Sequence, residues 1–382
     1  MPFRLRVMGD QLVSPQCLQL LGNQRLGKLR CLHKGADPGA LVVFHDLLED
    51  GLVVRRVFQD GRRLEHGEST LEHPCLSCTV RLDVVPTVRN LLATGSRIIV
   101  GLPPAAETAV QALLRGLGEA VTLDSTVFAC APDGLEDQIW DHHTLFESGF
   151  TPVPADDRTA GEFLMRELCF ADTVLLADPA PVPVDPATRL RGVQLIRELA
   201  PHAVLSESAG DVRTGRHNLA EATARTVPGT VRVPAEPSAP FTTVVHRLER
   251  PLHPERFRHA VATLAQACCW LRGRLWVASA PGCRIAVEGI GPRVWLENTG
   301  PWQTGRQSLP VMTRQDIGGW HPDYGDRGTV LAFTGDDVDA AEIVELLSGC
   351  ELSIAEMAAA ADSFLDPFHL NETTETSQRS NS

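Results

Sequence analysis

Lysine is almost absent from this chain of 382 residues. Lys28 and Lys34 are the only two, and the other basic residues are arginine. A phosphate-binding loop of the NTPase type needs a lysine directly before a serine or threonine, and the guanine-reading motif Asn-Lys-x-Asp needs another lysine far downstream. Because no lysine follows position 34, the sequence excludes the guanine-reading motif.

Long apolar runs are also missing, and basic charge is in deficit. No stretch reaches the ~18–20 apolar residues that a membrane helix needs, and residues 1–13 lack the pattern of a secretion signal. The chain has 35 Lys and Arg against 48 Asp and Glu, a net charge of −13. This balance disfavours a nucleic-acid groove, because phosphate contacts need a basic surface. We therefore expect a cytoplasmic protein without a membrane partner, whose contacts with RNA run through another protein.

Cysteine is too sparse for a disulfide scaffold, with ten residues in a chain of this length. Most of the ten lie in apolar segments, where a free cysteine packs like a small hydrophobic residue. The apolar fraction of 43% and the charged fraction of 22% are close to globular averages. They exclude general disorder, collagen and coiled coil.

Strand-like and helix-like segments alternate over residues 1–227, which predicts a layered α/β domain with a mostly parallel sheet. Interior strands of such a sheet are unbroken apolar runs, because helices cover both faces. The predicted strands are residues 5–8, 41–45, 52–58, 97–102, 121–129, 173–177 and 203–206. Helical spacing of apolar residues predicts helices around 84–92, 163–170 and 190–199.

A second domain is predicted after a proline-rich connector. Residues 228–243 hold four prolines and little apolar periodicity, which is typical of an extended linker. Residues 244–361 form a smaller domain whose strands and helices are segregated, so its predicted class is α+β. Its predicted elements are helix 254–271, strands 275–278, 284–287, 293–297 and 329–333, and helices 338–347 and 353–361. Residues 362–382 are rich in Ser, Thr and Glu and are predicted to be a disordered tail.

The most specific local motif is the pair Cys75 and Cys78, placed just before a helical pattern. Two thiols at this spacing can bind a soft metal or cycle through a disulfide, and a helix N-terminus favours the thiolate in both cases. The alternative is that both are small buried residues of a loop. His66 and His73 flank the pair and are candidate further ligands of a zinc ion.

Two other groups carry a functional and a structural interpretation. His142 and His143 follow Asp141, and they could approach the cysteines because strand ends converge at one edge of a parallel sheet. The alternative is a solvated pair on the surface. Trp276 and Trp302 belong to a tryptophan-rich part of the second domain and could anchor a protein interface. The alternative is that they are core residues.

These segments together resemble the CobW-type family of P-loop GTPases and metallochaperones. That family carries Gly-Cys-x-Cys-Cys-Thr-Val-Arg before a helix, and residues 74–81 of this chain are Pro-Cys-Leu-Ser-Cys-Thr-Val-Arg. Residues 250–257, 271–279, 300–302 and 331–335 resemble the CobW C-terminal domain. The resemblance covers most of residues 40–360. It implies a three-layer P-loop-NTPase-like domain at 1–227 and a CobW C-terminal-like domain at 244–361.

The nucleotide-binding elements of that family are largely lost here. The loop after strand 5–8 reads Gly-Asp-Gln-Leu-Val-Ser-Pro, with no second glycine and no lysine. A nominal match at Gly22, Gly27 and Lys28 ends in Leu29, where the family has the hydroxyl that holds Mg²⁺, and it follows a helix-like segment instead of a strand. The middle thiol of the cysteine motif is replaced by Ser77. Gly22, Gly27 and Lys28 therefore remain the candidate residues for residual GTP and Mg²⁺ binding.

Three functions are compatible with these residues. The first is an adaptor of cytoplasmic zinc homeostasis, which the resemblance to actinobacterial CobW-like proteins links to recruiting a hibernation factor to ribosomes when zinc is scarce. The second is a GTP-dependent zinc metallochaperone that uses Gly22–Lys28 together with Cys75 and Cys78. The third is a thiol redox protein that uses the two cysteines. The resemblance implies GTPase activity, and the missing motifs oppose it.

We predict that the protein hydrolyses no GTP above the buffer rate, because the loop after strand 5–8 lacks the lysine and serine or threonine pair. We also predict no preference for guanine, because no Asn-Lys-x-Asp motif is possible in this sequence. Phosphate release and a nucleotide titration with Mg²⁺ would measure this, and Lys28→Ala should change neither. A micromolar, Mg²⁺-dependent GTP affinity that Lys28→Ala removes would contradict the prediction and favour the metallochaperone.

Overall fold

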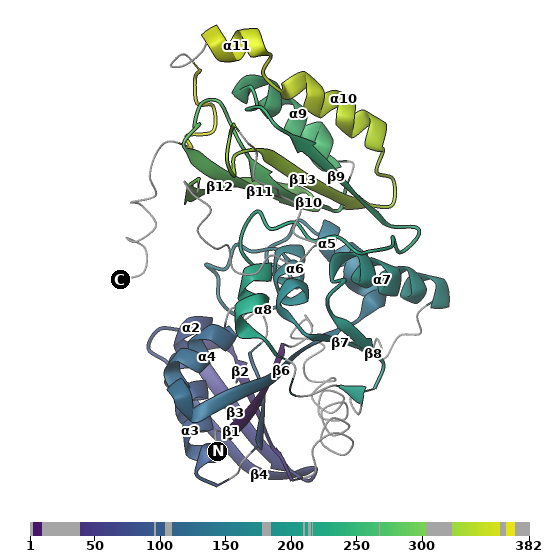
Figure 1. Cartoon of the computed structure of the whole chain (residues 1–382). Coiled ribbons are helices and arrows are strands. Elements are labelled where there is room, and N and C mark those ends of the chain that lie inside the picture. Colours follow the sequence, from purple (N-terminus) through teal and green to yellow (C-terminus); the bar gives the residue numbers. More distant parts are fainter. Residues whose placement is uncertain are drawn as a thin grey trace. The chain divides into compact units, whose positions relative to one another are not determined.

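The computed structural model describes residues 3–9, 39–94, 97–103, 109–177, 185–208, 211–212, 215, 217–266, 268–302, 323–359 and 364–370. The chain divides into two compact units, Met1–Thr226 and Val227–Ser382 (Figure 1). Gly22, Gly27 and Lys28 lie outside the described residues, as do the loop that follows strand 5–8 and most of the predicted tail.

The first unit is built on an eight-stranded sheet of order β4-β3-β2-β5-β1-β6-β7-β8. Neighbouring strands from β2 to β8 in this order are parallel, and the β3–β4 hairpin adds two antiparallel pairings at one edge. The strands are β1 (Phe3–Gly9), β2 (Leu41–Leu47), β3 (Leu52–Gln59), β4 (Arg62–Thr70), β5 (Arg97–Gly101), β6 (Val121–Cys130), β7 (Thr173–Leu176) and β8 (Val204–Ser206). The prediction of an α/β domain with a mostly parallel sheet is confirmed.

Helices connect these strands and cover the sheet. They are α2 (Leu76–Thr79), the π-helix η2 (Val80–Val84), α3 (Val85–Leu92), α4 (Ala109–Leu117), α5 (Leu135–Trp140), α6 (Ala160–Phe170), α7 (Pro186–Leu199) and α8 (Leu219–Arg225), with short 3₁₀ turns η1 (Glu49–Gly51), η3 (Gly118–Ala120) and η4 (Pro132–Gly134). Local sequence fixes their starts. Thr159 and Glu162 form a capping box at α6, and the Asp185 side chain accepts from the backbone of α7 while Pro186 opens that helix.

The two faces of the sheet carry separate apolar clusters. On one face Val43 and Val100 pack with Val88 of α3 and Leu113 of α4. On the other face Val42, Phe44, Ile99, Val127 and Leu175 form a second cluster. Alternate residues of β2 and β5 thus enter opposite clusters, which is why the sequence of these interior strands is apolar throughout.

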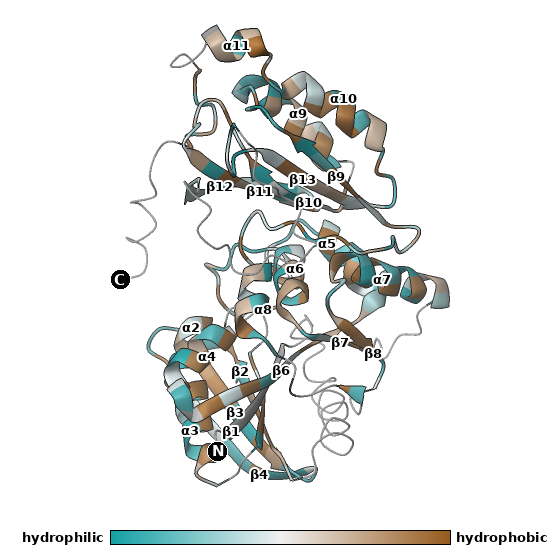
Figure 2. Cartoon of the chain, viewed as in Figure 1, coloured by the Kyte–Doolittle hydropathy of each residue, from teal (hydrophilic) through white to brown (hydrophobic). Residues whose placement is uncertain are grey.

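The edge strand β4 was not predicted. Its residues Arg62–Thr70 are nearly all polar and exposed, and Figure 2 shows the hydrophilic character of this strand. The strand pairs with β3 over most of its length. Backbone pairing, and not a buried face, therefore defines this strand, so apolar periodicity could not reveal it.

The second unit is a five-stranded antiparallel sheet of order β12-β11-β10-β13-β9. Its elements are β9 (Thr242–Leu248), α9 (Pro254–Gln266), β10 (Trp270–Leu275), β11 (Cys283–Ile290), β12 (Arg293–Pro301), β13 (Thr329–Gly335), α10 (Ala340–Cys350) and α11 (Ile354–Ala359). Phe257 of α9 and Leu347 of α10 are buried in one cluster with Leu271, Val287 and Phe333 of the sheet. The α+β class is confirmed.

The largest differences from the prediction in the second unit concern its first elements. The helix predicted for 254–271 ends at Gln266, and the strand predicted for 275–278 is β10, Trp270–Leu275. The apolar run at 268–271 was assigned to the helix because a short apolar run does not distinguish helix from strand. The unpredicted strand β9 begins at Thr242, inside the segment expected to be linker.

Parts of the segments predicted to be a linker and a disordered tail are packed against the sheet of the second unit. Val231 is buried in a cluster with Val330 and Ala332 of β13, and Arg272 donates to the carbonyl of Arg232 at 2.6 Å. Within the predicted tail, Leu370 is buried in the core and its carbonyl accepts from Asn298 at 2.9 Å. Apolar side chains thus tie parts of the proline-rich connector and of the tail to this domain.

Candidate metal centre

The cysteine motif lies at the carboxyl edge of the parallel sheet. Strand β3 is antiparallel to both β2 and β4, so β4 runs in the direction of β2 and its end, Thr70, lies where the parallel strands end. Open α/β sheets bind ligands at this edge. The chain leaves β4 through residues 71–75 and enters α2, so the topology places both cysteines there.

Gly51 supports the loop that leads to the cysteines. Its carbonyl accepts from the Leu71 backbone at 2.9 Å. Its φ is +73°, and an added Cβ would lie 2.7 Å from the Leu71 carbonyl oxygen and 3.2 Å from the Pro74 Cβ. Only glycine combines this backbone conformation with so close an approach. Gly51 therefore fixes the path of the chain between β4 and the motif.

His73, Cys75 and Cys78 bring three metal-binding atoms together. One ring nitrogen of His73 and the two Sγ atoms all lie within 4.8 Å of one another. The Cys75 Sγ accepts from the Cys78 backbone at 3.2 Å, so Cys75 caps the N-terminus of α2. His73 Nδ1 lies 3.8 Å from the Cys78 Sγ. Both cysteines are free and half-buried, and His73 is exposed.

The two thiols are coupled electrostatically. The hydrogen bond with Cys75, together with partial burial and the charge of Cys75, raises the pKa of Cys78, while Arg81 acts in the opposite direction. The raised pKa disfavours the thiolate form of Cys78 when no metal ion is bound. A bound cation would have to displace protons from the pair.

The donor set suits a zinc ion. Zinc binds thiolate and imidazole ligands, usually four in a tetrahedron, and a site with three protein ligands keeps one position for water or another molecule. His73, Cys75 and Cys78 supply three such donors from six consecutive residues. The site can thus hold an ion while leaving one coordination position accessible.

The other predicted ligand, His66, is not part of this group. It lies on β4 with its Nε2 atom 3.2 Å from Glu68 Oε1, and 44% of its side chain is exposed. Among the described residues, the donors that converge on the cysteines include His73 and not His66. Asp141, His142 and His143 likewise form a separate group.

Asp83 attaches the helix that follows the cysteines to three strands. Its Oδ1 atom lies 3.1 Å from His45 Nε2 and 3.0 Å from Arg55 Nη1, and its Oδ2 accepts from Ser69 Oγ at 2.6 Å. These partners belong to β2, β3 and β4. Asp83 itself lies in the π-helix η2, a helical form often found at functional sites. The carboxylate thus fixes the cysteine-bearing helix on the hairpin edge of the sheet.

Burial and hydrogen bonding oppose each other in this network. Burial alone would raise the pKa of Asp83, but the hydrogen bonds from Ser69 and Arg55 and the nearby imidazole of His45 outweigh it and hold that pKa well below its usual range. Burial lowers the pKa of His45 below the ordinary 6.5, although the neighbouring Asp83 opposes the change. The network is therefore an anionic carboxylate beside a neutral imidazole and a cationic guanidinium.

The network around Asp83 cannot be predicted from apolar periodicity, although one of its members, His45, is a polar residue in the mostly apolar strand β2. A polar residue in the middle of such a strand needs a buried partner, and that was the available signal. Asp83, in the helix after the cysteines, is this partner.

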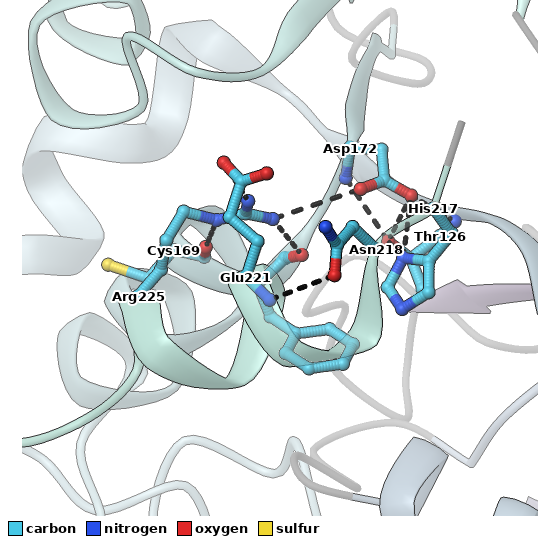
Figure 3. Close-up of polar contacts among 8 residues, drawn as sticks. Thr126, Cys169, Asp172, His217, Asn218, Glu221 and Arg225 are labelled. Carbon is cyan, nitrogen blue, oxygen red and sulfur yellow. Dashed lines mark hydrogen bonds and ion pairs between the residues drawn. The ribbon is translucent and has the colours of Figure 1, made fainter. Parts of the chain in front are cut away.

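A second polar network lies at the amino end of β7 and connects the last helix of the first unit, α8, to the rest of that unit (Figure 3). Asp172 Oδ2 accepts from the backbone and the hydroxyl of Thr126, both at 2.9 Å, and lies 2.9 Å from His217 Nδ1. Arg225 of α8 donates to the carbonyls of Cys169 and Phe170 at 2.7 and 3.0 Å. These contacts attach His217 to Asp172 and thereby to β6, and they attach α8 to the end of α6.

The predicted interface tryptophans are buried within the second unit. Trp276 is 4% exposed and Trp302 is 6% exposed. The Trp276 ring packs 5.2 Å from that of Tyr324. This burial fits the alternative that both are core residues, and their role at an interface stays a prediction.

Within the part of the chain that the structure describes, no helix is long and apolar enough to cross a membrane.

Comparison with known proteins agrees with the motifs and the fold. Residues 241–351 match the family model of the cobalamin synthesis protein cobW C-terminal domain. The chain is 27% identical over 362 residues to the protein named zinc chaperone Rv0106 of Mycobacterium tuberculosis (strain H37Rv), covering 86% of this chain and 87% of that protein. The same values relate it to the uncharacterized protein Mb0109 of Mycobacterium bovis. Residues 241–351 thus carry a CobW C-terminal domain.

Among solved structures, the chain is similar to the Zn(II)-bound YjiA GTPase from E. coli. The match covers 92% of this chain and 100% of that one, with 12% sequence identity and a TM-score of 0.36.

We predict that His45 makes stability fall with acidity. Its pKa is lower in the folded chain than the ordinary 6.5, so below about pH 6.5 the unfolded chain binds a proton that the folded chain does not, and the free energy of unfolding decreases as pH falls. The loss is at most about 1.4 kcal/mol per pH unit for one group. Urea unfolding at pH 7, 6 and 5 should give a shallower pH dependence for His45→Gln than for the natural chain.

His66→Gln is the matched control, because it removes a histidine whose side chain is exposed and lies outside the Asp83 network. Equal slopes for the natural chain and His45→Gln would show that the buried imidazole does not exclude the proton.

Proposed function

We propose that this chain is a CobW-type protein of zinc homeostasis that binds one Zn²⁺ at His73, Cys75 and Cys78. The observation that carries the proposal is the approach of these three donor atoms to within 4.8 Å. The name of the mycobacterial relative, a zinc chaperone, supports the same metal. Zinc is the cargo here, and three protein ligands leave a coordination position through which it can be handed over.

The surroundings of the site favour a loop that keeps its shape when the ion leaves. Leu47, Val53 and Leu71 form a buried cluster, and Leu76, Cys78 and Val153 pack against it. Asp83 and Gly51 hold the two ends of the segment from outside the ligand set. Binding therefore needs little ordering of the chain, and release does not require the helix to unfold.

The redox alternative uses the same cysteines but not His73. A dithiol pair needs only two sulfur atoms, whereas a metal site needs further nitrogen, sulfur or oxygen donors. The ring of His73 within 3.8 Å of the Cys78 sulfur is the observation that favours metal over redox chemistry.

The second part of the proposal is that the chain acts as an adaptor and recruits a ribosome-associated hibernation factor when zinc is limiting. The loss of the nucleotide-binding motifs supports it, because the α/β scaffold then serves as a surface more than as a hydrolase. The net charge of −13 also supports docking of a basic protein and opposes direct binding to RNA. The alternative, a GTP-dependent zinc metallochaperone, would depend on Gly22, Gly27 and Lys28.

We expect the purified protein to take up one equivalent of Zn²⁺ at the cysteine motif, and the double variant Cys75→Ser, Cys78→Ser to lose that equivalent, since serine hydroxyls do not replace thiolates as zinc ligands. His73→Ala should weaken binding without abolishing it, because two of the three ligands remain. Metal analysis and competition with a chromogenic chelator would measure both. Cys283→Ser and His66→Ala, which change residues outside the group, are the controls, and undiminished uptake by the double cysteine variant would end the proposal.

For the adaptor, capture from zinc-limited cells with the full chain as bait should recover a basic, ribosome-associated protein, and added salt should reduce its capture because it screens the acidic surface. Capture of no such protein together with tight binding of naked ribosomal RNA would contradict the adaptor and leave the zinc site untouched.

A further inference from the structure

A second group of metal-binding side chains lies in the first unit, directly after α5. Donor atoms of Asp141, His142 and His143 all lie within 4.8 Å of one another. The group follows β6 in the chain, while the cysteine motif follows β4. It contains no sulfur, so its chemistry differs from that of the cysteine motif.

The backbone on both sides of this group is anchored in the core. Ile139 and Leu145 are both completely buried, and the Leu145 backbone donates to the Arg158 carbonyl at 2.7 Å. Thr144 pairs with Thr159 in an isolated β-bridge. Three exposed or half-exposed residues therefore stand between two fixed points, which restricts where their side chains can go.

A hydrogen bond orients one imidazole of the group. Asp141 Oδ1 accepts from the backbone of His143 at 3.0 Å and lies 2.7 Å from His143 Nδ1. A carboxylate bound to one ring nitrogen fixes the tautomer and leaves the other nitrogen as a metal ligand. The Nε2 atom of His143 makes no hydrogen bond to any residue that the structure describes, and it is therefore free to bind an ion.

The second imidazole lies against the first. The ring centroids of His142 and His143 are 4.1 Å apart, with an angle of 33° between the planes. Within the described ranges, the two ring nitrogens of His142 and the Oδ2 atom of Asp141 take part in no hydrogen bond. The two rings and the carboxylate thus present unused nitrogen and oxygen donors at one place on the surface.

The charge around the rings favours a cation. Burial would raise the pKa of Asp141, but hydrogen bonds from His143 outweigh it and lower that pKa. Glu147 accepts from the backbone and the hydroxyl of Thr144, which lowers its pKa. Two carboxylates, those of Asp141 and Glu147, therefore lie near the two imidazoles.

We propose that Asp141, His142 and His143 form a second binding site for a divalent transition-metal ion such as Zn²⁺ or Co²⁺. His142 and the Nε2 atom of His143 supply the nitrogen ligands, Asp141 orients His143 through its hydrogen bond to Nδ1, and water completes the coordination. Imidazole ligands suit these ions. The site goes beyond the proposed function, since it neither needs nor uses the cysteines.

Titration with Co²⁺ distinguishes the two sites, because thiolate ligation gives a charge-transfer band that nitrogen and oxygen ligation does not. We expect the natural chain at pH 7.5 to bind two equivalents. Cys75→Ser, Cys78→Ser should bind one equivalent without the band. His142→Ala, His143→Ala should also bind one equivalent and keep the band at full intensity.

His259→Ala is the control for the loss of an exposed histidine, because His259 lies on α9 of the second unit with 72% of its side chain exposed. It should leave two equivalents bound. The single variant His143→Gln, which keeps the size of the side chain, should lose the same equivalent as the double variant. Circular dichroism melting would verify that all variants are folded.

Two results would overturn the second site. One is an unchanged Co²⁺ stoichiometry in His142→Ala, His143→Ala measured in the cysteine-free background. The other is loss of the thiolate band in the histidine variant, which would make the histidines ligands of the cysteine site. Absence of the band from the natural chain would instead refute the first site alone, so the two proposals fail independently.

Discussion

A buried carboxylate must be surrounded by donors, and in this protein that requirement determines where the cysteine motif lies. Asp83 is 5% exposed, and an unpaired charge at such a position would be strongly destabilising. His45, Arg55 and Ser69 meet the requirement from three successive strands. Removing one partner of a buried pair costs about 3–5 kcal/mol, so helix and hairpin are held in one relative position, and the thiols with them.

The same carboxylate explains why the helix after Cys78 departs from regular α geometry. Residues 80–84 form a π turn between α2 and α3. A π turn inserts an extra residue into a helix and changes which side chains point at the sheet. Here Val80, Asp83 and Val84 are all buried. The turn thus allows a charged residue to face the hairpin while the neighbouring valines stay in the apolar core.

How far the sequence predicts this protein depends on whether burial or backbone pairing defines an element. The interior strands β2, β5 and β7 are apolar runs and were predicted to within two residues at either end. The edge strand β4 and the strand β9 carry no such pattern and were missed. Spacing alone brought Cys75, Cys78 and His73 together, because they are adjacent in the chain. The exclusion of His66 and the partnership of His45 with Asp83 depend on the register of three strands, which sequence periodicity does not specify.

The polar sequence of β4 also has a consequence for association between copies of the chain. An edge strand presents unpaired backbone groups that another strand can extend, and charged side chains oppose this. Strand β4 carries Arg62, Arg63, Glu65 and Glu68 on exposed positions. A second chain adding its own strand there would have to bring its side chains against these charges. Among the described strands, β4 therefore ends the sheet. Its charged side chains leave the segment from β4 to the cysteines accessible to solvent and to a soluble partner.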